Sequence, residues 1–519
     1  MLARFRVLVP AAVVASFSVL ALNPFVARAD EFVDRVNAPY SRISDAKRSD
    51  LVVLPLLAKM AAVPGGLQDG GMLEDAALLT HEQAAFAEAA AWAQAPEQKA
   101  VLEALARVTE DDDPETRMVF AQPYGVEGAA PELVEVGMYT DLGDPPLLAA
   151  AKFGYLDGLE AVGLLAFVEA QRLVGEGKPG EAMEVLLDLI AFGRQLTDRA
   201  FVKERALGEM MMFIGFVSIR DIAYRDSKAS THALTSDGIR AVIRRLDDRR
   251  ATVGLERMLI PTGDQVALEQ LLNRIYTSSG AADPESFATT LSSLSAAERP
   301  LRLFSEAARW DQVRAVAAPA EETRRALSRM YSDWVRRWSL QVSDPLLSSP
   351  TDFSKVVQGR PNMAVLELAA PAERLFATRK NLMTEAAGTR MSLAMYGQFL
   401  KQGSYPLALT AVRPSFIQTI DVDPYIPSRS IRFFVPVRDT KGPQGTAQPL
   451  EMRVFPRKPL KPFSITLRDD VFVMYSIGPD EDDGHAQNIT QSDSGGDYLL
   501  WPPMLSLLRQ SLIDQGELE

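Results

Sequence analysis

Apolar residues between positions 151 and 250 recur with the spacing of an α-helix. Leu156, Leu159, Val162 and Ala166 fall three or four residues apart, which places them on one helical face. A stretch rich in Gly and Pro at 175–180 interrupts the pattern, and a second apolar face follows it. Two amphipathic helices joined by a short turn form an antiparallel hairpin. Further helical patterns at 210–222 and after Ser236 extend the hairpin into a multi-helix bundle.

The helical pattern continues through residues 255–340. Trp334 and Trp338 are four residues apart and therefore lie on one face of a helix. Aromatic residues at this spacing are usually core anchors. The Ser- and Pro-containing stretch 343–350 then favours a loop, and we place a linker at 341–366.

The pattern changes beyond residue 366. A helix is predicted from Pro371 to Gln402, with Gly403 as its stop signal. Runs rich in β-branched and aromatic residues follow, and these favour strands. The predicted strands are Ile431 to Val437, Glu451 to Phe455, Phe463 to Arg468 and Val471 to Ile477. A long helix followed by an antiparallel sheet makes a small α+β module.

We therefore expect a mainly α protein, in which a multi-helix bundle with helical hairpins precedes the α+β module. The predicted divisions are a signal peptide (1–29), an N-terminal helical region (30–150), a helical domain (151–340), the linker (341–366), the module (367–510) and a tail (511–519).

The first 29 residues have the pattern of an export signal. Arg4 and Arg6 precede an apolar run from Val7 to Leu22, and Ala27-Arg28-Ala29 matches a signal-peptidase site. Cleavage there would make Asp30 the mature N-terminus. The alternative is an uncleaved anchor, although about 16 apolar residues are short for a hydrocarbon core about 30 Å thick. We expect an exported protein of the periplasm, cell envelope or extracellular space, with no membrane-spanning segment after cleavage.

Composition narrows the classes of function. The 519 residues carry 55 basic and 68 acidic side chains, a formal charge of -13. Because nucleic-acid binding requires a basic surface, we expect no nucleic-acid partner. The chain has no Cys and only three His residues. It therefore has no disulfide or thiol nucleophile, and its His residues are too few and too scattered to predict a zinc site.

The C-terminal region carries an ordered set of short motifs. After the helix come Gly403-Ser404-Tyr405-Pro406, Asp423-Pro424-Tyr425, the run Tyr475 to Asp480, and Asp497 with Trp501 four residues later. In this order the motifs resemble the C-terminal domain of the major pseudopilins of type II secretion, as found also in large secreted planctomycete-type bacterial proteins. The resemblance covers about a quarter of the chain. The N-terminus lacks the prepilin leader, so we do not expect pilin-type assembly.

The pseudopilin resemblance implies a Ca²⁺ site in the last loop. Asp480 and Asp497 match the family's acidic positions, and Asp482, Asp483 and Asp493 could add oxygen ligands. Ca²⁺ takes six to eight oxygens, and the spacing here is not that of an EF-hand. The alternative is an acidic loop that is simply solvated.

No complete catalytic constellation is visible in the sequence. There is no G-x-S-x-G motif. We expect a non-catalytic extracytoplasmic protein that binds other proteins or has a structural role in the cell envelope. The alternative is a secreted hydrolase that uses a pair of carboxylates in a helical cleft, because sequence does not show how far apart two carboxylates lie.

Overall fold

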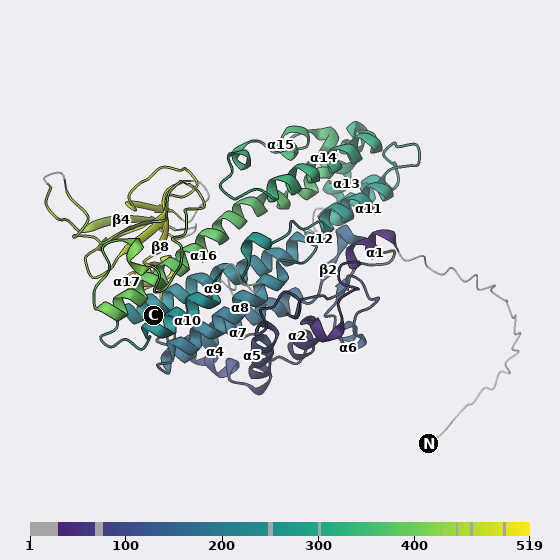
Figure 1. The fold of residues 1–519 in the computed structure, drawn as a ribbon. Helices are drawn as coiled ribbons and strands as arrows, with labels where there is room; N and C mark the ends of the chain where they lie inside the picture. Colours follow the sequence, from purple (N-terminus) through teal and green to yellow (C-terminus); the bar gives the residue numbers. More distant parts are fainter. Residues whose placement is uncertain are drawn as a thin grey trace, which may run out of the picture.

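The structure is a computed structural model that describes residues 30–67, 76–247, 253–298, 303–426, 428–442, 445–456, 460–490 and 495–518. The predicted signal peptide, residues 1–29, lies outside this described part. Helices form most of the regular structure, which confirms the expected mainly α fold (Figure 1).

Short helices dominate the N-terminal region. They are α1 (Glu31–Asn37), α2 (Asp50–Leu57), α4 (Phe86–Ala93), α5 (Pro96–Thr109) and α6 (Pro131–Glu135), with a two-stranded sheet of β1 (Thr140–Asp141) and β2 (Lys152–Phe153). Helices α2 and α5 pack against each other, and α5 packs on the central helices.

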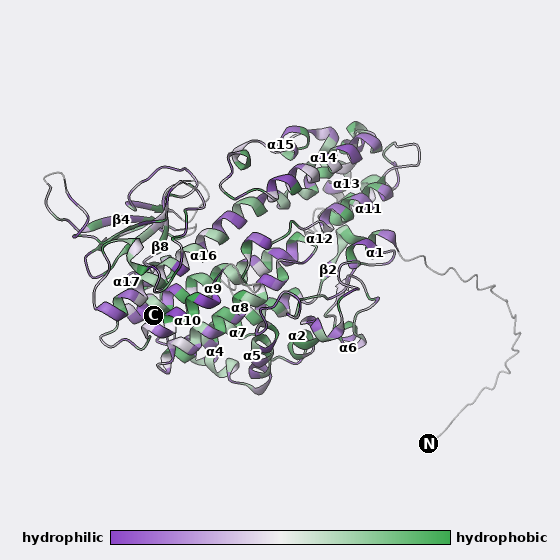
Figure 2. Ribbon diagram, in the orientation of Figure 1, coloured by the Kyte–Doolittle hydropathy of each residue, from purple (hydrophilic) through white to green (hydrophobic). Residues whose placement is uncertain are grey.

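Four helices form the centre of the molecule: α7 (Leu156–Gly175), α8 (Pro179–Leu196), α9 (Val202–Lys228) and α10 (Ser236–Arg245). The predicted hairpin is present as α7 and α8, whose turn contains Gly177 with a φ of 76°. Helices α8 and α9 approach very closely. A Cβ added to Gly208 would lie 2.4 Å from the carbonyl oxygen of Gly193, so this contact requires glycine. Figure 2 shows hydrophobic positions gathered where α7 and α8 lie side by side.

A second group of helices covers one end of the molecule (Figure 1). It contains α11 (Gly263–Ile275), α12 (Ser286–Glu298), α13 (Leu303–Val316) and α14 (Ala320–Trp338). Trp334 and Trp338 of α14 are buried, as expected for core anchors.

The segment 341–366, which we predicted to be a linker, is folded and packed. It contains a 3-10 helix (Pro345–Ser348), α15 (Asp352–Val356) and the start of a second 3-10 helix (Pro361–Ala369). The buried Arg337 guanidinium donates hydrogen bonds to three of its carbonyl oxygens. The acceptors are Leu346, Ser349 and Pro350, at 2.6, 2.9 and 3.1 Å. Pro and Ser therefore mark tight turns here and not a free connection.

The C-terminal region begins with α16 (Pro371–Gln402), which has the predicted bounds and ends at Gly403 in the left-handed conformation. The strands are β3 (Arg432–Phe434), β4 (Leu450–Phe455), β5 (Phe463–Leu467), β6 (Val473–Ser476), β7 (Asn488–Thr490) and β8 (Tyr498–Trp501). Helix α17 (Met504–Asp514) follows them. It extends past residue 510, so its last residues lie in the predicted tail.

The prediction of one antiparallel sheet was wrong. Strands β3, β6 and β8 form an antiparallel sheet, but β5, β4 and β7 form a second, mixed sheet. Its β4 and β7 are parallel, with Val454 opposite Ile489. The chain passes through β5 and β6 before it returns to β4, and a parallel pair needs such a crossover.

The helical and C-terminal regions share one hydrophobic core, which runs from Val53 to Leu507. Helix α16 packs on α9 and α10 and also on β6 and β8. At this junction Arg220 of α9 pairs with Glu385 of α16 and donates to Thr389 at 2.6 Å. Tyr498 of β8 donates to the same Glu385 carboxylate. The predicted module is therefore part of the main body.

The end of the chain is tied to the rest in the same way. Arg509 of α17 pairs with the buried Asp221 of α9 at 2.9 Å. Its other guanidinium nitrogens donate to the carbonyl oxygens of Ala77 and Leu78, both at 2.9 Å. One side chain thus joins the N-terminal, central and C-terminal regions.

Candidate functional site

Four of the five predicted calcium ligands lie on two neighbouring segments, 478–486 and 495–497, which we together call the acidic loop. Asp480 accepts a hydrogen bond from the backbone N–H of Gly496 at 2.6 Å. Asp497 is fully buried and accepts from the N–H groups of Ala486 and Gly484, at 2.7 and 3.3 Å. The structure therefore brings Asp480 and Asp497 to the same place.

The remaining predicted ligands are arranged differently. Asp483 accepts from the Tyr475 hydroxyl at 2.8 Å and pairs with Arg432 at 2.8 Å, so its carboxylate is already engaged. Asp482 is exposed. Asp493 lies outside the described residues.

Burial, with a smaller effect of the negative charges of Asp483 and Asp480, raises the pKa of Asp497 to about 6. Its two backbone hydrogen bonds act in the opposite direction but do not cancel the burial. A cation beside this carboxylate would favour its ionised form.

Two neighbouring carboxylates supply only the beginning of a Ca²⁺ shell of six to eight oxygens. Within the described ranges, no group of three or more His, Cys, Asp or Glu side chains is arranged to hold a metal. Loop carbonyls, water and Asp493 would have to complete the shell. The calcium site stays a prediction.

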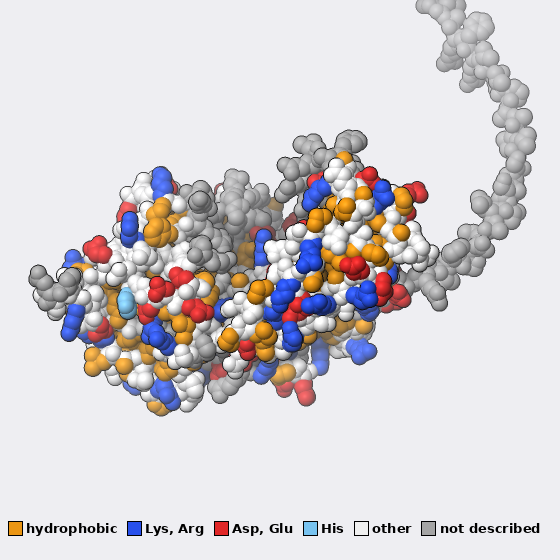
Figure 3. All heavy atoms as spheres, turned by 90° about the horizontal axis from the view of Figure 1, so that it is seen from above, with side chains coloured by type: hydrophobic (Ala, Val, Ile, Leu, Met, Phe, Trp, Pro, Cys, Tyr) orange, Lys and Arg blue, Asp and Glu red, His pale blue; other side chains and the backbone are white. Residues whose placement is uncertain are grey.

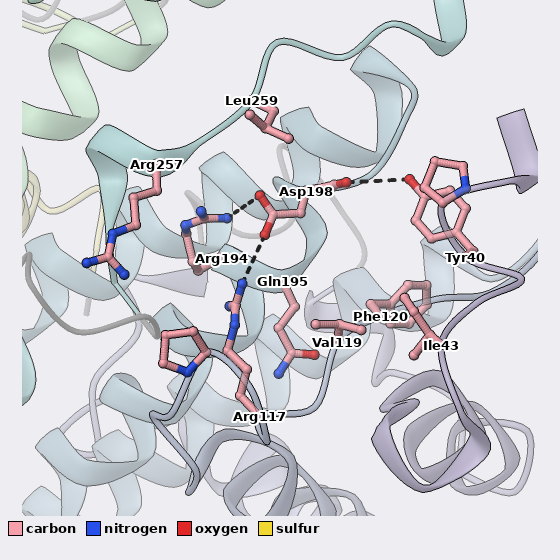
Figure 4. A pocket seen from close by; sticks show the side chains of 12 residues that line it. Tyr40, Ile43, Arg117, Val119, Phe120, Arg194, Gln195, Asp198, Arg257 and Leu259 are labelled. Carbon is pink, nitrogen blue, oxygen red and sulfur yellow. Dashed lines mark hydrogen bonds and ion pairs between the residues drawn. The ribbon is translucent and has the colours of Figure 1, made fainter.

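A cavity of about 360 Å³ opens elsewhere, between four segments of the helical region (Figure 4). Its walls come from the turn after α1, the segment after α5, the end of α8, and the segment before α11. We call it the arginine cavity, and it is lined by Pro39, Tyr40, Ile43, Pro114, Arg117, Val119, Phe120, Arg194, Gln195, Asp198, Arg257 and Leu259.

Two of its arginines converge on its one carboxylate, Asp198 (Figure 4). Arg194 donates to Asp198 at 2.6 Å and to Thr197 at 3.0 Å. Arg117 approaches the other carboxylate oxygen of Asp198 at 3.5 Å. Burial lowers the pKa of Arg117, and the positive charges of Arg194 and Arg257 lower it further. The Asp198 carboxylate acts in the opposite direction.

A buried polar cluster supports the cavity. The Arg199 guanidinium lies 4.2 Å from the ring centroid of Tyr40 and pairs with Glu204 at 2.7 Å, and both charged side chains are buried. Tyr124 and Tyr155 also donate to Glu204, at 2.7 and 2.6 Å. These contacts fix the position of Tyr40 on the cavity wall.

Sequence reasoning missed this cavity. Its arginines lie at positions 117, 194 and 257, so no motif spacing connects them. One signal was available: Arg194 interrupts the apolar stretch at the end of α8, and a charge at such a place must find partners inside the fold.

A comparison of the chain with protein-family models, curated proteins and solved structures finds no match. The pseudopilin resemblance therefore stays a prediction. In the part of the chain that the structure describes, no helix has both the length and the apolar character needed to cross a membrane.

Proposed function

We propose that this protein is an exported, non-catalytic component of the cell envelope that acts by binding a partner protein. The export signal and the extracytoplasmic location come from the sequence pattern of residues 1–29. The joined regions of the fold would suit a rigid body that presents fixed surfaces to a partner.

The arginine cavity is the observation that carries the binding role. Its charge comes from guanidinium groups, which do not lose protons in proteins and therefore recognise anions instead of transferring protons. Its single carboxylate, Asp198, is held by Arg194 and Arg117. A hydrolase of the carboxylate-pair type needs two carboxyl groups facing one site, and this cavity lining contains one.

The surface of the molecule is mixed on the face drawn in Figure 3. Basic and acidic side chains are interspersed there, with hydrophobic side chains in small groups. Leu259 stands at the cavity with 72% of its surface exposed. A partner that inserts an acidic group would cover this side chain.

Cell fractionation with photo-crosslinking tests this proposal. A photo-reactive residue at Leu259 should crosslink to a partner in the envelope fraction, and Arg257→Gln should remove that product. The same residue at Val335, which is 47% exposed on α14, is the matched control. Protein retained in the cytoplasm, or crosslinks that ignore Arg257→Gln, would contradict the proposal.

A further inference from the structure

The arginine cavity brings guanidinium groups together in an acidic chain. Three arginines and one aspartate line it, in a chain of formal charge -13. Arg194 is almost fully buried, and its Nε atom has no hydrogen-bond partner among the described residues. An unpaired buried donor is costly, so an added acceptor would be stabilised there.

The rest of the lining is apolar. Ile43, Val119, Phe120 and Leu259 face the same space as the guanidinium groups, together with the ring of Tyr40. Small-molecule sites combine mostly apolar walls with a few fixed polar groups, and about 360 Å³ lies within their usual range of sizes.

The polar groups are held in position before any ligand arrives. Asp198 fixes the Arg194 guanidinium at 2.6 Å, and Thr197 supports it at 3.0 Å. Arg117 is held less closely, at 3.5 Å from Asp198. Fixed guanidinium groups match the planar geometry of a carboxylate, with which they can form two parallel hydrogen bonds.

We propose that the arginine cavity binds a carboxylate attached to a small apolar body, with the carboxylate at the guanidinium groups and the body against the apolar wall. This ligand chemistry rests on the proposed binding role of the cavity. A free organic acid and the C-terminal residue of a peptide can both present such a carboxylate on an apolar body.

Isothermal titration calorimetry on the purified protein tests the proposal with four probes and inorganic phosphate. The probes are 3-phenylpropanoate, its neutral amide, N-acetyl-glycyl-phenylalanine, and the amide of that peptide. We expect each amide to bind at least about tenfold more weakly than its acid, because it loses the charge-assisted bonds. A tighter peptide acid identifies a chain end as the ligand, and an equal or tighter small acid identifies a free metabolite.

Variants locate the site. Arg257→Gln should weaken binding of the acids about tenfold. Leu259→Asp, at an exposed position that tolerates substitution, should abolish it by placing a negative charge at the entrance. Arg325→Gln on α14, whose side chain is 72% exposed and lies outside the cavity, is the matched control and should leave affinity unchanged.

Three results would overturn the proposal: acids and amides of equal affinity, phosphate that binds as well as the acids, or no binding of either acid at millimolar concentration. Unchanged affinity in both cavity variants would also overturn it. Intact acid binding in solution with no crosslink at Leu259 in cells would contradict the proposed function alone.

Discussion

The arginine cavity and the acidic loop both gather like charges, but the chain builds them in different ways. The carboxylates of the acidic loop lie within residues 480–497, and Asp480 and Asp497 accept mainly from backbone N–H groups of the same two loops. The cavity takes its arginines from three separate segments, and side chains hold them. A local cluster is stabilised by its own turn, whereas a cluster from distant segments depends on the whole fold.

The two sites also differ in what surrounds the charge. Asp497 is buried beside other acids and takes up a proton more readily as a result. The guanidinium groups cannot release protons, and Arg194 and Arg117 share Asp198 as a counter-charge. A proton or a cation can compensate the acidic loop, whereas the charge of the cavity favours a carboxylate such as Asp198.

The largest effect on stability is expected at Glu204, in the buried polar cluster that supports the cavity. Glu204→Gln should lower the free energy of unfolding by about 3 to 5 kcal/mol, because it leaves the buried Arg199 without a counter-charge. Urea unfolding measures this change. Glu97→Gln, on the exposed face of α5, should change it by less than about 0.5 kcal/mol. Equal costs for the two variants would show that the buried cluster does not support the cavity.

A smaller effect is expected from Ca²⁺ at the acidic loop. At about 100 times its Kd, Ca²⁺ should stabilise the protein by about 2.7 kcal/mol and raise its Tm. The double variant Asp480→Ala, Asp497→Ala should remove the rise, and Mg²⁺ at the same concentration is the comparison ion. An unchanged Tm at millimolar Ca²⁺ would leave the loop as a solvated acidic surface.

The pH dependence of stability separates the two sites further. The pKa of Asp497 is raised from 3.8 to about 6 in the folded protein. Its contribution to the free energy of unfolding is therefore fully present below pH 4 and is lost as pH rises through 6. The loss should be about 2 kcal/mol. Burial also raises the pKa of Asp264 to about 6. The measurement is therefore the difference between wild type and Asp497→Ala in urea from pH 4 to 8, and a constant difference would contradict it.

The smallest effect is expected at Asp482. This side chain is exposed, so Asp482→Asn should change the free energy of unfolding by less than about 0.5 kcal/mol. It should also leave the Ca²⁺ response in place. A loss of that response would make Asp482 a ligand and move the expected site toward the tip of the loop.

What could be predicted from the sequence follows the same division between local and distant contacts. Helix α16 and the hairpin of α7 and α8 have local apolar periodicity and clear stop signals, and both were predicted. Strands β7 and β8 were missed because each is three or four residues long and depends on partners far along the chain. The shared core was missed because a packed turn and a linker both use Pro and Ser.

The candidate sites show this most clearly. Asp480 and Asp497 could be predicted to meet because a resemblance placed them on one loop pair. Arg117, Arg194 and Arg257 meet only because α8 ends beside the segments after α5 and before α11. No periodicity in the sequence encodes that meeting.

The most direct test of the cavity as a binding site is a crystal structure of the protein with 3-phenylpropanoate. We predict ligand density in the arginine cavity, with the carboxylate within hydrogen-bonding distance of a guanidinium of Arg117, Arg194 or Arg257 and the ring against Phe120 and Leu259. Density for the ligand at another place, or an empty cavity at saturating ligand, would contradict the account.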